Sequence, residues 1–328
     1  MKSVLFIAPA FFEYEISIKD AIQQNGYDVD YFDERTSNNS FLKAIFRVKK
    51  DFLERWINRY YSIILKTISN KKYNYFLLIK GEVIPKWFVI EFKRLNPESK
   101  LIYYTYDSIY LNNKNPESFL KYFDSCYSFD FKDVMHNPDV FKLKHLFYTK
   151  DFIAKDQPDK KYTISFVGTL HSNRYAQVKK LFSYFDKTLV FFYSPAKWFF
   201  LFEKLFKKSH RSVKWSDVSF NKLNIRQVAN IFKSSNSVLD IQRSGQTGLT
   251  MRTFEVLAAG ALLITTNDYI KEAGFYNPLF IVVLDELDWE EKIDEIREKI
   301  NALKTSKKSL FTESDEFYIS NWVKEFFI

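Results

Sequence analysis

The chain of 328 residues is 46% hydrophobic and 27% charged, and its formal net charge is +9. This composition excludes a disordered or collagen-like chain, and the length predicts two folded domains. A single cysteine, Cys126, excludes an internal disulfide and a cysteine-based zinc site and favours a reducing compartment. Because no run of 18 uncharged apolar residues occurs, we expect no transmembrane helix, and the positive charge favours anionic partners.

Short apolar runs alternate with stretches of helical periodicity, which predicts βαβ units around parallel sheets. The strands expected in the first half are residues 4–8, 28–32, 75–79, 101–106, 126–129 and 145–147. Those expected in the second half are residues 163–167, 188–192, 213–215, 237–241, 262–265 and 280–283. The fold class is therefore α/β, with two Rossmann-like doubly wound domains and a ligand cleft at the carboxyl ends of their strands.

A polar stretch at 148–161 is the best linker candidate, so we expect an N-terminal domain over 1–150 and a C-terminal domain over 151–310. The remaining segment, 311–328, contains one amphipathic pattern over 315–327. We expect this segment to form a helix that packs back on the first domain.

The segment 240–260 carries the clearest chemistry. A strand ends near Gln242, a loop with two of the seven glycines follows, and a helix begins near Thr250. Helix N-termini and glycine-containing loops offer backbone amides to phosphates, and the guanidinium groups of Arg243 and Arg252 match phosphate oxygens. A carboxylate at Glu255 suits ribose hydroxyls.

A structural alternative accounts for the same residues. Thr250 then serves only as an N-cap, Gly260 only ends the helix, and Arg252 with Glu255 forms a solvated surface pair.

The run R-T-F-E-V-L-A-A-G-A-L-L-I-T at 252–265 resembles the donor-site signature of group-1 glycosyltransferases of the GT-B fold, above all the R-x-F-E-x-L-A-x-G pattern of the CgeB-like branch. The run I-S-F-V-G-T-L at 164–170, with Arg174 after it, resembles the family's F-V-G-x-L strand and loop. The resemblance covers residues 160–285.

This resemblance implies a glycosyltransferase whose second domain holds a nucleotide-sugar donor, with Glu255 on the ribose, and whose first domain holds the acceptor. The residues expected around the donor are Gly168, Thr169, Arg174, Arg243, Gly245, Thr247, Gly248, Leu249, Thr250, Arg252 and Glu255. Many retaining GT-B enzymes have a second glutamate eight residues before the first, and Thr247 stands there, which puts a retaining mechanism in doubt.

An inverting transfer needs a general base on the acceptor hydroxyl. Three carboxylates follow predicted strands of the first domain. Asp107 is the first choice and Glu13 the second, with Glu82 third; the alternative for Asp107 is an N-cap. None of the four histidines, among them His171, has a partner at metal-ligand spacing, so we expect metal-independent catalysis without a cofactor.

Two basic aromatic segments, 40–68 and 197–208, have the pattern of amphipathic helices. Such helices either lie in a membrane interface or cover their own sheet. The first possibility suits a peripheral protein on the inner face of the cytoplasmic membrane that acts on a lipid-linked acceptor.

The leading hypothesis is a cytoplasmic glycosyltransferase that moves a sugar from a nucleoside-diphosphate donor to a saccharide or lipid-linked saccharide in bacterial lipopolysaccharide or capsule synthesis. The bacterial setting is an expectation from the family and from the Lys-, Asn- and Ile-rich composition. A catalytically inert GT-B-like nucleotide-binding scaffold is the alternative. A NAD-dependent oxidoreductase is disfavoured because the loop at 8–13 has no glycine, and a nucleic-acid binder because 40 acidic residues are spread along the chain.

Overall fold

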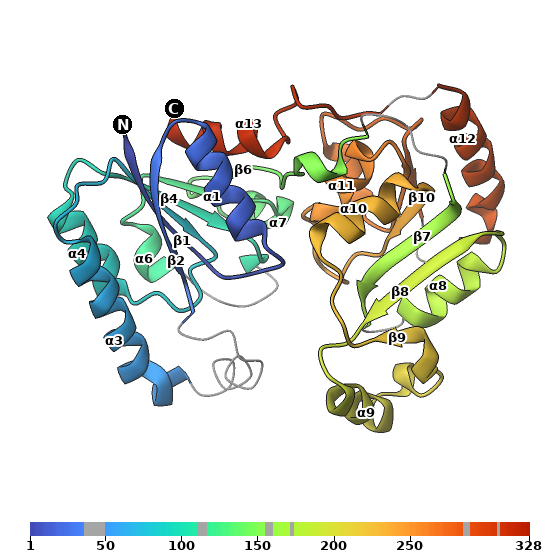
Figure 1. Cartoon of the computed structure of the whole chain (residues 1–328), viewed down its shortest axis with the longest axis horizontal. Coiled ribbons are helices and arrows are strands. Elements are labelled where there is room, and N and C mark those ends of the chain that lie inside the picture. Colours follow the sequence, from blue (N-terminus) through green and yellow to red (C-terminus); the bar gives the residue numbers. More distant parts are fainter. Residues whose placement is uncertain (36–49, 110–116, 155–159, 171–173, 285–288, 307–308) are drawn as a thin grey trace. The chain divides into compact units, whose positions relative to one another are not determined.

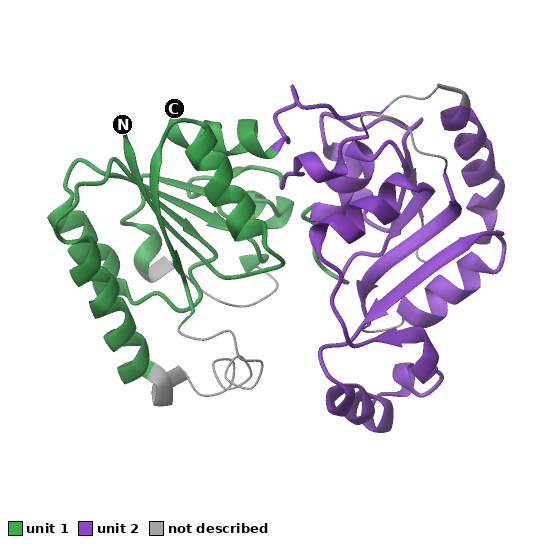
Figure 2. Ribbon diagram, in the orientation of Figure 1, with its two compact units in different colours: residues 1–145, 245–248, 319–328 green, residues 146–244, 249–318 purple. Residues whose placement is uncertain are grey.

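The computed structural model describes residues 1–35, 50–109, 117–154, 160–170, 174–284, 289–306 and 309–328 (Figure 1). The chain divides into two compact units (Figure 2). Unit 1 contains Met1–His145, Gly245–Gly248 and Ile319–Ile328, and unit 2 contains Leu146–Ser244 and Leu249–Tyr318. Each unit is built around its own parallel sheet.

Unit 1 has a six-stranded parallel sheet in the order β2-β1-β3-β4-β5-β6. Its strands are β1 (Ser3–Ala8), β2 (Asp28–Asp33), β3 (Tyr75–Ile79), β4 (Lys100–Thr105), β5 (Ser125–Ser128) and β6 (Phe141–Leu143). Its helices are α1 (Tyr14–Gln24), α3 (Lys50–Ile68), α4 (Lys86–Leu95), α6 (Glu117–Leu120), α7 (Phe131–His136) and α13 (Ile319–Lys324). The strand order reverses between β1 and β3, which makes the gap between their carboxyl ends the topological switch point of this sheet.

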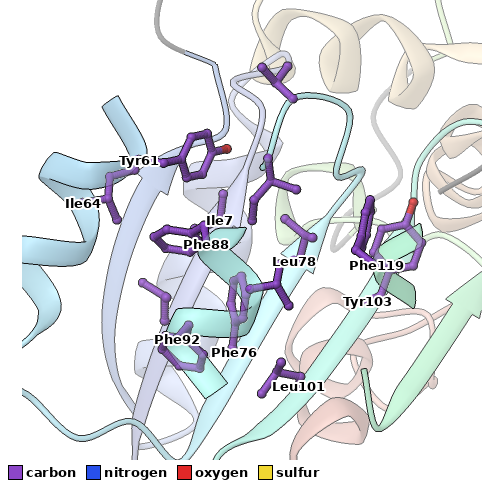
Figure 3. Close-up of a cluster of buried hydrophobic side chains, with 14 of the residues drawn as sticks. Ile7, Tyr61, Ile64, Phe76, Leu78, Phe88, Phe92, Leu101, Tyr103 and Phe119 are labelled. Carbon is purple, nitrogen blue, oxygen red and sulfur yellow. The ribbon is translucent and has the colours of Figure 1, made fainter. Parts of the chain in front are cut away.

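The central strands of unit 1 are buried on both faces, as expected for a parallel sheet between helices. Alternate residues point to opposite faces, so Phe76 and Leu78 of β3 pack with Phe88 and Phe92 of α4 on one side (Figure 3). On the other side, Tyr75 contacts Phe327. The continuous apolar runs in the sequence therefore mark strands with no solvent-facing side.

The C-terminal segment Ile319–Ile328 is part of unit 1. Trp322 is 1% exposed, its indole N–H donates to the His145 carbonyl at 2.7 Å, and its ring meets Tyr104 edge to face. The helix expected over 315–327 is shorter than predicted: α13 begins at Ile319, because the side chain of Asp315 closes a turn on the Thr312 amide.

Unit 2 has a second six-stranded parallel sheet in the order β12-β11-β10-β7-β8-β9. Its strands are β7 (Tyr162–Thr169), β8 (Thr188–Tyr193), β9 (Val218–Ser219), β10 (Ser235–Asp240), β11 (Leu262–Thr265) and β12 (Ile281–Val283). Its helices are α8 (Arg174–Phe182), α9 (Lys197–Phe206), α10 (Ile225–Lys233), α11 (Met251–Ala258) and α12 (Ile293–Ser306). Here the order reverses between β7 and β10, which places the switch point at their carboxyl ends. The expected α/β class with two Rossmann-like sheets is confirmed.

Two predicted strands are wrong. The run 145–147 forms no ladder, since the carbonyls of Lys144 and His145 accept bonds from the side chains of Tyr104 and Trp322, and the strand lies earlier, at Phe141–Leu143. The run 213–215 leads into a 3₁₀ turn, because the Asp217 amide bonds back to the Lys214 carbonyl, and pairing begins only at Val218. In both places an apolar run of the sequence lies outside the strand ladder.

Trp322→Ala should lower the free energy of unfolding of unit 1 by about 3–5 kcal/mol, because it empties a buried aromatic site. Trp322→Phe should cost less, since the ring contact survives and only the indole hydrogen bond is lost. Urea unfolding followed by circular dichroism measures both. Trp198→Ala is the control, because Trp198 is 70% exposed. An unchanged transition for Trp322→Ala would mean that the C-terminal segment is not part of the cooperative unit.

Candidate functional site

The switch point of unit 2 is bridged by Arg174, the first residue of α8. Its guanidinium donates to the carbonyl of Ile241, directly after β10, at 2.5 Å, and it lies 3.5 Å from the carbonyl of Thr169, the last residue of β7. The side chain therefore spans the two central strand ends, where ligands bind in open α/β sheets.

Asp240, the last residue of β10, is fully buried and holds the start of α11. Its carboxylate accepts a bond from the Thr250 hydroxyl at 2.5 Å and pairs with the Arg252 guanidinium at 2.6 Å. Thr250 occupies the N-cap position of α11, but its hydroxyl makes no cap bond to the helix. The hydroxyl donates to the Asp240 carboxylate instead. Arg252 remains 21% exposed at its side chain.

The charges of Arg174, Arg252 and Asp240 act on one another. Burial and, to a lesser extent, the neighbouring Arg252 lower the pKa of Arg174 to about 10, and the charge of Asp240 opposes this change. Two guanidinium groups therefore lie at the end of the central strands of unit 2. Guanidinium donors match phosphate oxygens geometrically, so this arrangement favours an anionic ligand.

The other donor-site candidates of unit 2 lie close by in sequence. Glu255 is on α11 and only 4% exposed, so the solvated surface pair with Arg252 is excluded, and Leu249 is buried. Arg243 is exposed. Gly168 lies in β7, where a Cβ would come within 2.8 Å of the Phe166 ring, so close packing alone requires a glycine there.

The loop Gly245–Gly248 belongs to unit 1, and Asp130 holds it. One carboxylate oxygen of Asp130 accepts the amides of Thr247 and Gly248, both at 3.0 Å, and the other accepts the Thr247 hydroxyl at 2.6 Å. These amides, expected near a diphosphate, thus donate to a carboxylate in this structure. Gly248 packs so tightly on Phe129 that a Cβ would lie 2.5 Å from the ring.

The switch point of unit 1 carries backbone strain. After β1, Phe12 and Glu13 have φ values of 52° and 67°, and after β3, Lys80 has a φ of 78°. Left-handed conformations at residues other than glycine are uncommon and cluster at functional sites. Phe11 and Phe12 are also half exposed, although apolar. Glu13 caps no helix amide with its side chain.

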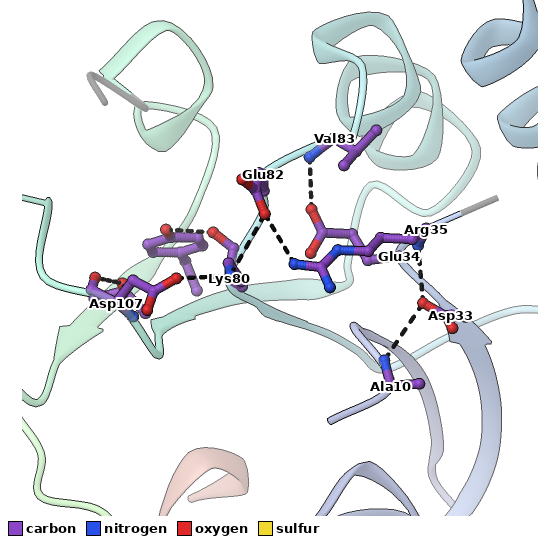
Figure 4. Close-up of polar contacts among 10 residues, drawn as sticks. Ala10, Asp33, Glu34, Arg35, Lys80, Glu82, Val83 and Asp107 are labelled. Atoms are coloured by element: carbon purple, nitrogen blue, oxygen red, sulfur yellow. Dashed lines mark hydrogen bonds and ion pairs between the residues drawn. The ribbon is translucent and has the colours of Figure 1, made fainter. Parts of the chain in front are cut away.

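A chain of alternating charges crosses the same edge of the sheet (Figure 4). Arg35, after β2, pairs with Glu82 at 3.0 Å. Lys80, after β3, lies 3.4 Å from Glu82 and 2.6 Å from Asp107, which follows β4. The structure therefore brings Asp107 together with Glu82 through Lys80, and the Asp107 carboxylate, half exposed, is oriented by this ion pair.

Glu34 lies beside this chain and was not predicted from the sequence. It is fully buried; its carboxyl accepts the Val83 amide at 2.6 Å, and burial raises its pKa to about 7. The charges of Lys80 and Arg35 lower this pKa and that of Glu82 raises it. A glutamate after a strand resembles a surface loop residue, so the sequence gives no signal of its burial.

The histidine and basic-segment expectations concern residues that the structure describes only in part. His171 and residues 40–49 of the first basic segment lie outside the described residues. Within the described ranges, no group of three His, Cys, Asp or Glu side chains has the arrangement of a metal site. Of the helices in the described part of the chain, none combines the length and apolarity that crossing a bilayer requires.

Comparisons with known proteins agree with this architecture. Residues 200–311 match the family model described as glycosyl transferase-like. A search of curated sequences gives no match. Among solved structures, an α,α-trehalose-phosphate synthase (UDP-forming) from Burkholderia xenovorans is similar with a TM-score of 0.64 at 9% identity, over 100% of this chain and 99% of that one.

Two further solved structures are similar over the whole chain. AviGT4, a glycosyltransferase involved in avilamycin A biosynthesis, has a TM-score of 0.57 at 12% identity, with 100% of this chain and 96% of the other covered. Anabaena Alr3699/HepE, solved with UDP-glucose, has a TM-score of 0.56 at 9% identity, with 100% and 99% covered.

The fold and the family match together define the class. The chain has the GT-B fold, and its residues 200–311, nearly all of them in unit 2, match a glycosyl transferase-like family model. The predicted resemblance to group-1 GT-B glycosyltransferases is confirmed, and with it the enzyme class, glycosyltransferase. The CgeB-like branch stays a prediction.

Glu34→Gln should remove a pH dependence of stability. With a folded pKa of about 7 against an ordinary 4.5, folded Glu34 keeps a proton that the unfolded chain releases, so its stabilisation is full below about pH 4.5 and is lost as pH rises through about 7. The loss is on the order of 3 kcal/mol, at about 1.4 kcal/mol per pKa unit. Glutamine keeps the acceptor for the Val83 amide.

Urea unfolding from about pH 5 to about pH 8 measures the difference between the wild type and the variant. Glu13→Gln, an exposed glutamate of the same unit, is the control. Parallel pH curves for wild type and Glu34→Gln would contradict the raised pKa.

Proposed function

We propose that the protein transfers a sugar from a nucleoside-diphosphate sugar to a saccharide or lipid-linked saccharide acceptor. We place this reaction in bacterial surface-polysaccharide assembly, of lipopolysaccharide or capsule, at the cytoplasmic side of the membrane. The nucleotide sugar is a substrate, and the reaction needs no metal or cofactor.

One observation supports the donor assignment: two guanidinium groups lie at the switch point of unit 2, where Arg174 donates to the Ile241 carbonyl and Arg252 pairs with the buried Asp240. Asp240 fixes Arg252 and the start of α11, so the Arg252 guanidinium is held at the strand end where a diphosphate would lie. When the sugar departs, negative charge grows on the diphosphate, and preorganised guanidinium groups stabilise this change without metal. Glu255, on the same helix, is the proposed partner of the ribose hydroxyls.

Two further facts support a nucleotide-sugar donor. The glycosyl transferase-like match falls in unit 2 and includes Asp240, Arg252 and Glu255. The Anabaena neighbour of the same fold was solved with UDP-glucose.

We assign the acceptor to the switch point of unit 1. Strained backbone at Phe12, Glu13 and Lys80 surrounds the carboxyl ends of β1 and β3, and the exposed rings of Phe11 and Phe12 offer apolar surfaces to the C–H faces of a sugar ring. Asp107 is the proposed base: its carboxylate accepts the proton of the acceptor hydroxyl as that oxygen attacks the anomeric carbon. This role fits an inverting reaction, as does Thr247 in place of a second glutamate.

Arg174→Ala should weaken binding of the preferred nucleoside diphosphate by about 1–3 kcal/mol, roughly 5- to 150-fold, because a charged hydrogen bond is lost. A thermal-shift panel of UDP, GDP, ADP, CMP and NAD, with and without EDTA, first identifies the nucleotide. Arg226→Ala is the matched control, since Arg226 lies in the same unit with its side chain 84% exposed. A shift with NAD alone would refute the donor assignment, and equal affinity in both variants would remove Arg174 from the site.

Asp107→Asn should lower kcat about 10²- to 10⁴-fold and leave nucleotide affinity unchanged, since only the proton acceptor is lost. Sugar transfer from the nucleotide sugar identified by the panel measures kcat. Asp28→Asn is the control: its side chain is 51% exposed, against 52% for Asp107, and it also pairs with one lysine. Full activity of Asp107→Asn would exclude this base, and nucleotide binding without any sugar turnover in the wild type would favour the inert scaffold.

A further inference from the structure

Helix α9 (Lys197–Phe206) has its polarity inverted relative to an ordinary surface helix. Its fully buried residues are Phe200 and the charged Glu203. Its large apolar residues face solvent. The exposed members are Trp198 at 70%, Leu201 at 47%, Phe202 at 54%, Leu205 at 61% and Phe206 at 71%.

These five side chains form one continuous surface. At about 100° per residue they occupy an arc of roughly 140° around the helix axis, without a charged residue inside it. Phe202 and Phe206 are in ring contact at 4.6 Å. On the opposite side, Phe200 anchors the helix edge to face on Trp215. Monomeric proteins rarely expose so dense an apolar patch without a partner for it.

The charge around the patch has one sign. Lys197 begins the helix, and Lys207 and Lys208 follow it, all of them exposed. The one acid of the helix, Glu203, is withdrawn inside, where Lys207 pairs with it at 2.5 Å and His210 lies 3.6 Å away. An anionic surface would therefore meet lysines and apolar rings and no exposed carboxylate of this helix.

We propose that the exposed face of α9 docks on a lipid bilayer that contains anionic headgroups. The apolar arc enters the boundary between headgroups and acyl chains, and the lysines contact lipid phosphates, as for interfacial amphipathic helices. The charge complementarity favours this occupant over a second copy of the chain, because two such faces would bring their lysines together.

Helix α9 also follows the carboxyl end of a strand in the sheet of unit 2. It follows β8, whose last residue, Tyr193, is the register partner of Thr169 at the end of β7. Arg174 and Asp240 lie at this same edge of the sheet. Docking through α9 would therefore turn this edge towards the lipid. This consequence for catalysis rests on the proposed function, whereas the docking itself does not.

Flotation of the full chain with vesicles tests the proposal. Wild type should float with vesicles of phosphatidylcholine and phosphatidylglycerol in a two-to-one ratio, and more weakly with phosphatidylcholine alone. Leu205→Ser combined with Phe206→Ser should lower the partition coefficient about tenfold or more, because two exposed apolar side chains no longer enter the bilayer. Lys197→Gln combined with Lys208→Gln should lower it about tenfold on anionic vesicles and leave binding to neutral vesicles unchanged.

The matched control is Met135→Ser combined with Leu279→Ser, two apolar residues that are 70% and 41% exposed elsewhere in the chain. Circular dichroism and urea unfolding confirm that each variant is folded. Equal flotation of the α9 variant and the control overturns the proposal, as does a wild type that does not float. A wild-type dimer that becomes monomeric in the α9 variant, without vesicle binding, assigns the face to a second copy instead. Nucleotide binding that persists in the α9 variant separates this test from that of the donor site.

Discussion

Both sheets of the protein are parallel and covered on two faces, and this constraint decides where chemistry can lie. A charged side chain within a central strand would be buried without water, at a cost of several kcal/mol. The charged groups that act must therefore follow the strand ends, and the place with most room is where neighbouring strands send their connections to opposite faces. The two switch points, β1/β3 and β7/β10, meet this condition, and the polar clusters of each unit lie there.

The charged groups at the two switch points are arranged differently. In unit 2, the buried carboxylate of Asp240 holds the Arg252 guanidinium, and the neighbouring Ile241 carbonyl holds that of Arg174, so two guanidinium groups are fixed at this edge. In unit 1, the ammonium group of Lys80 lies between the carboxylates of Asp107 and Glu82, so positive and negative charges largely cancel there. Lys80 itself has a left-handed backbone conformation. An edge of the first kind suits a diphosphate, and one of the second kind suits a neutral substrate whose hydroxyl must be oriented.

The sequence was sufficient for the sheets and for part of the site, because both depend on local patterns. Runs such as 75–79 are apolar throughout and could only be central strands, and the motif around Arg252 has a fixed spacing. Interactions between distant residues were not accessible. Asp130 meets its loop more than a hundred residues along the chain, and Glu34 is buried by its packing near Tyr61 and Val83. The strand expected at 145–147 failed for the same reason: side chains from elsewhere took its carbonyls.

The carboxylate of Asp130 is the hydrogen-bond acceptor of the loop Gly245–Gly248. It receives two amides and a hydroxyl, a set of donors that an incoming phosphate oxygen would also use. The donors of this loop are therefore already satisfied by an anion that the chain itself encodes, and an external anion would gain them only by displacing Asp130.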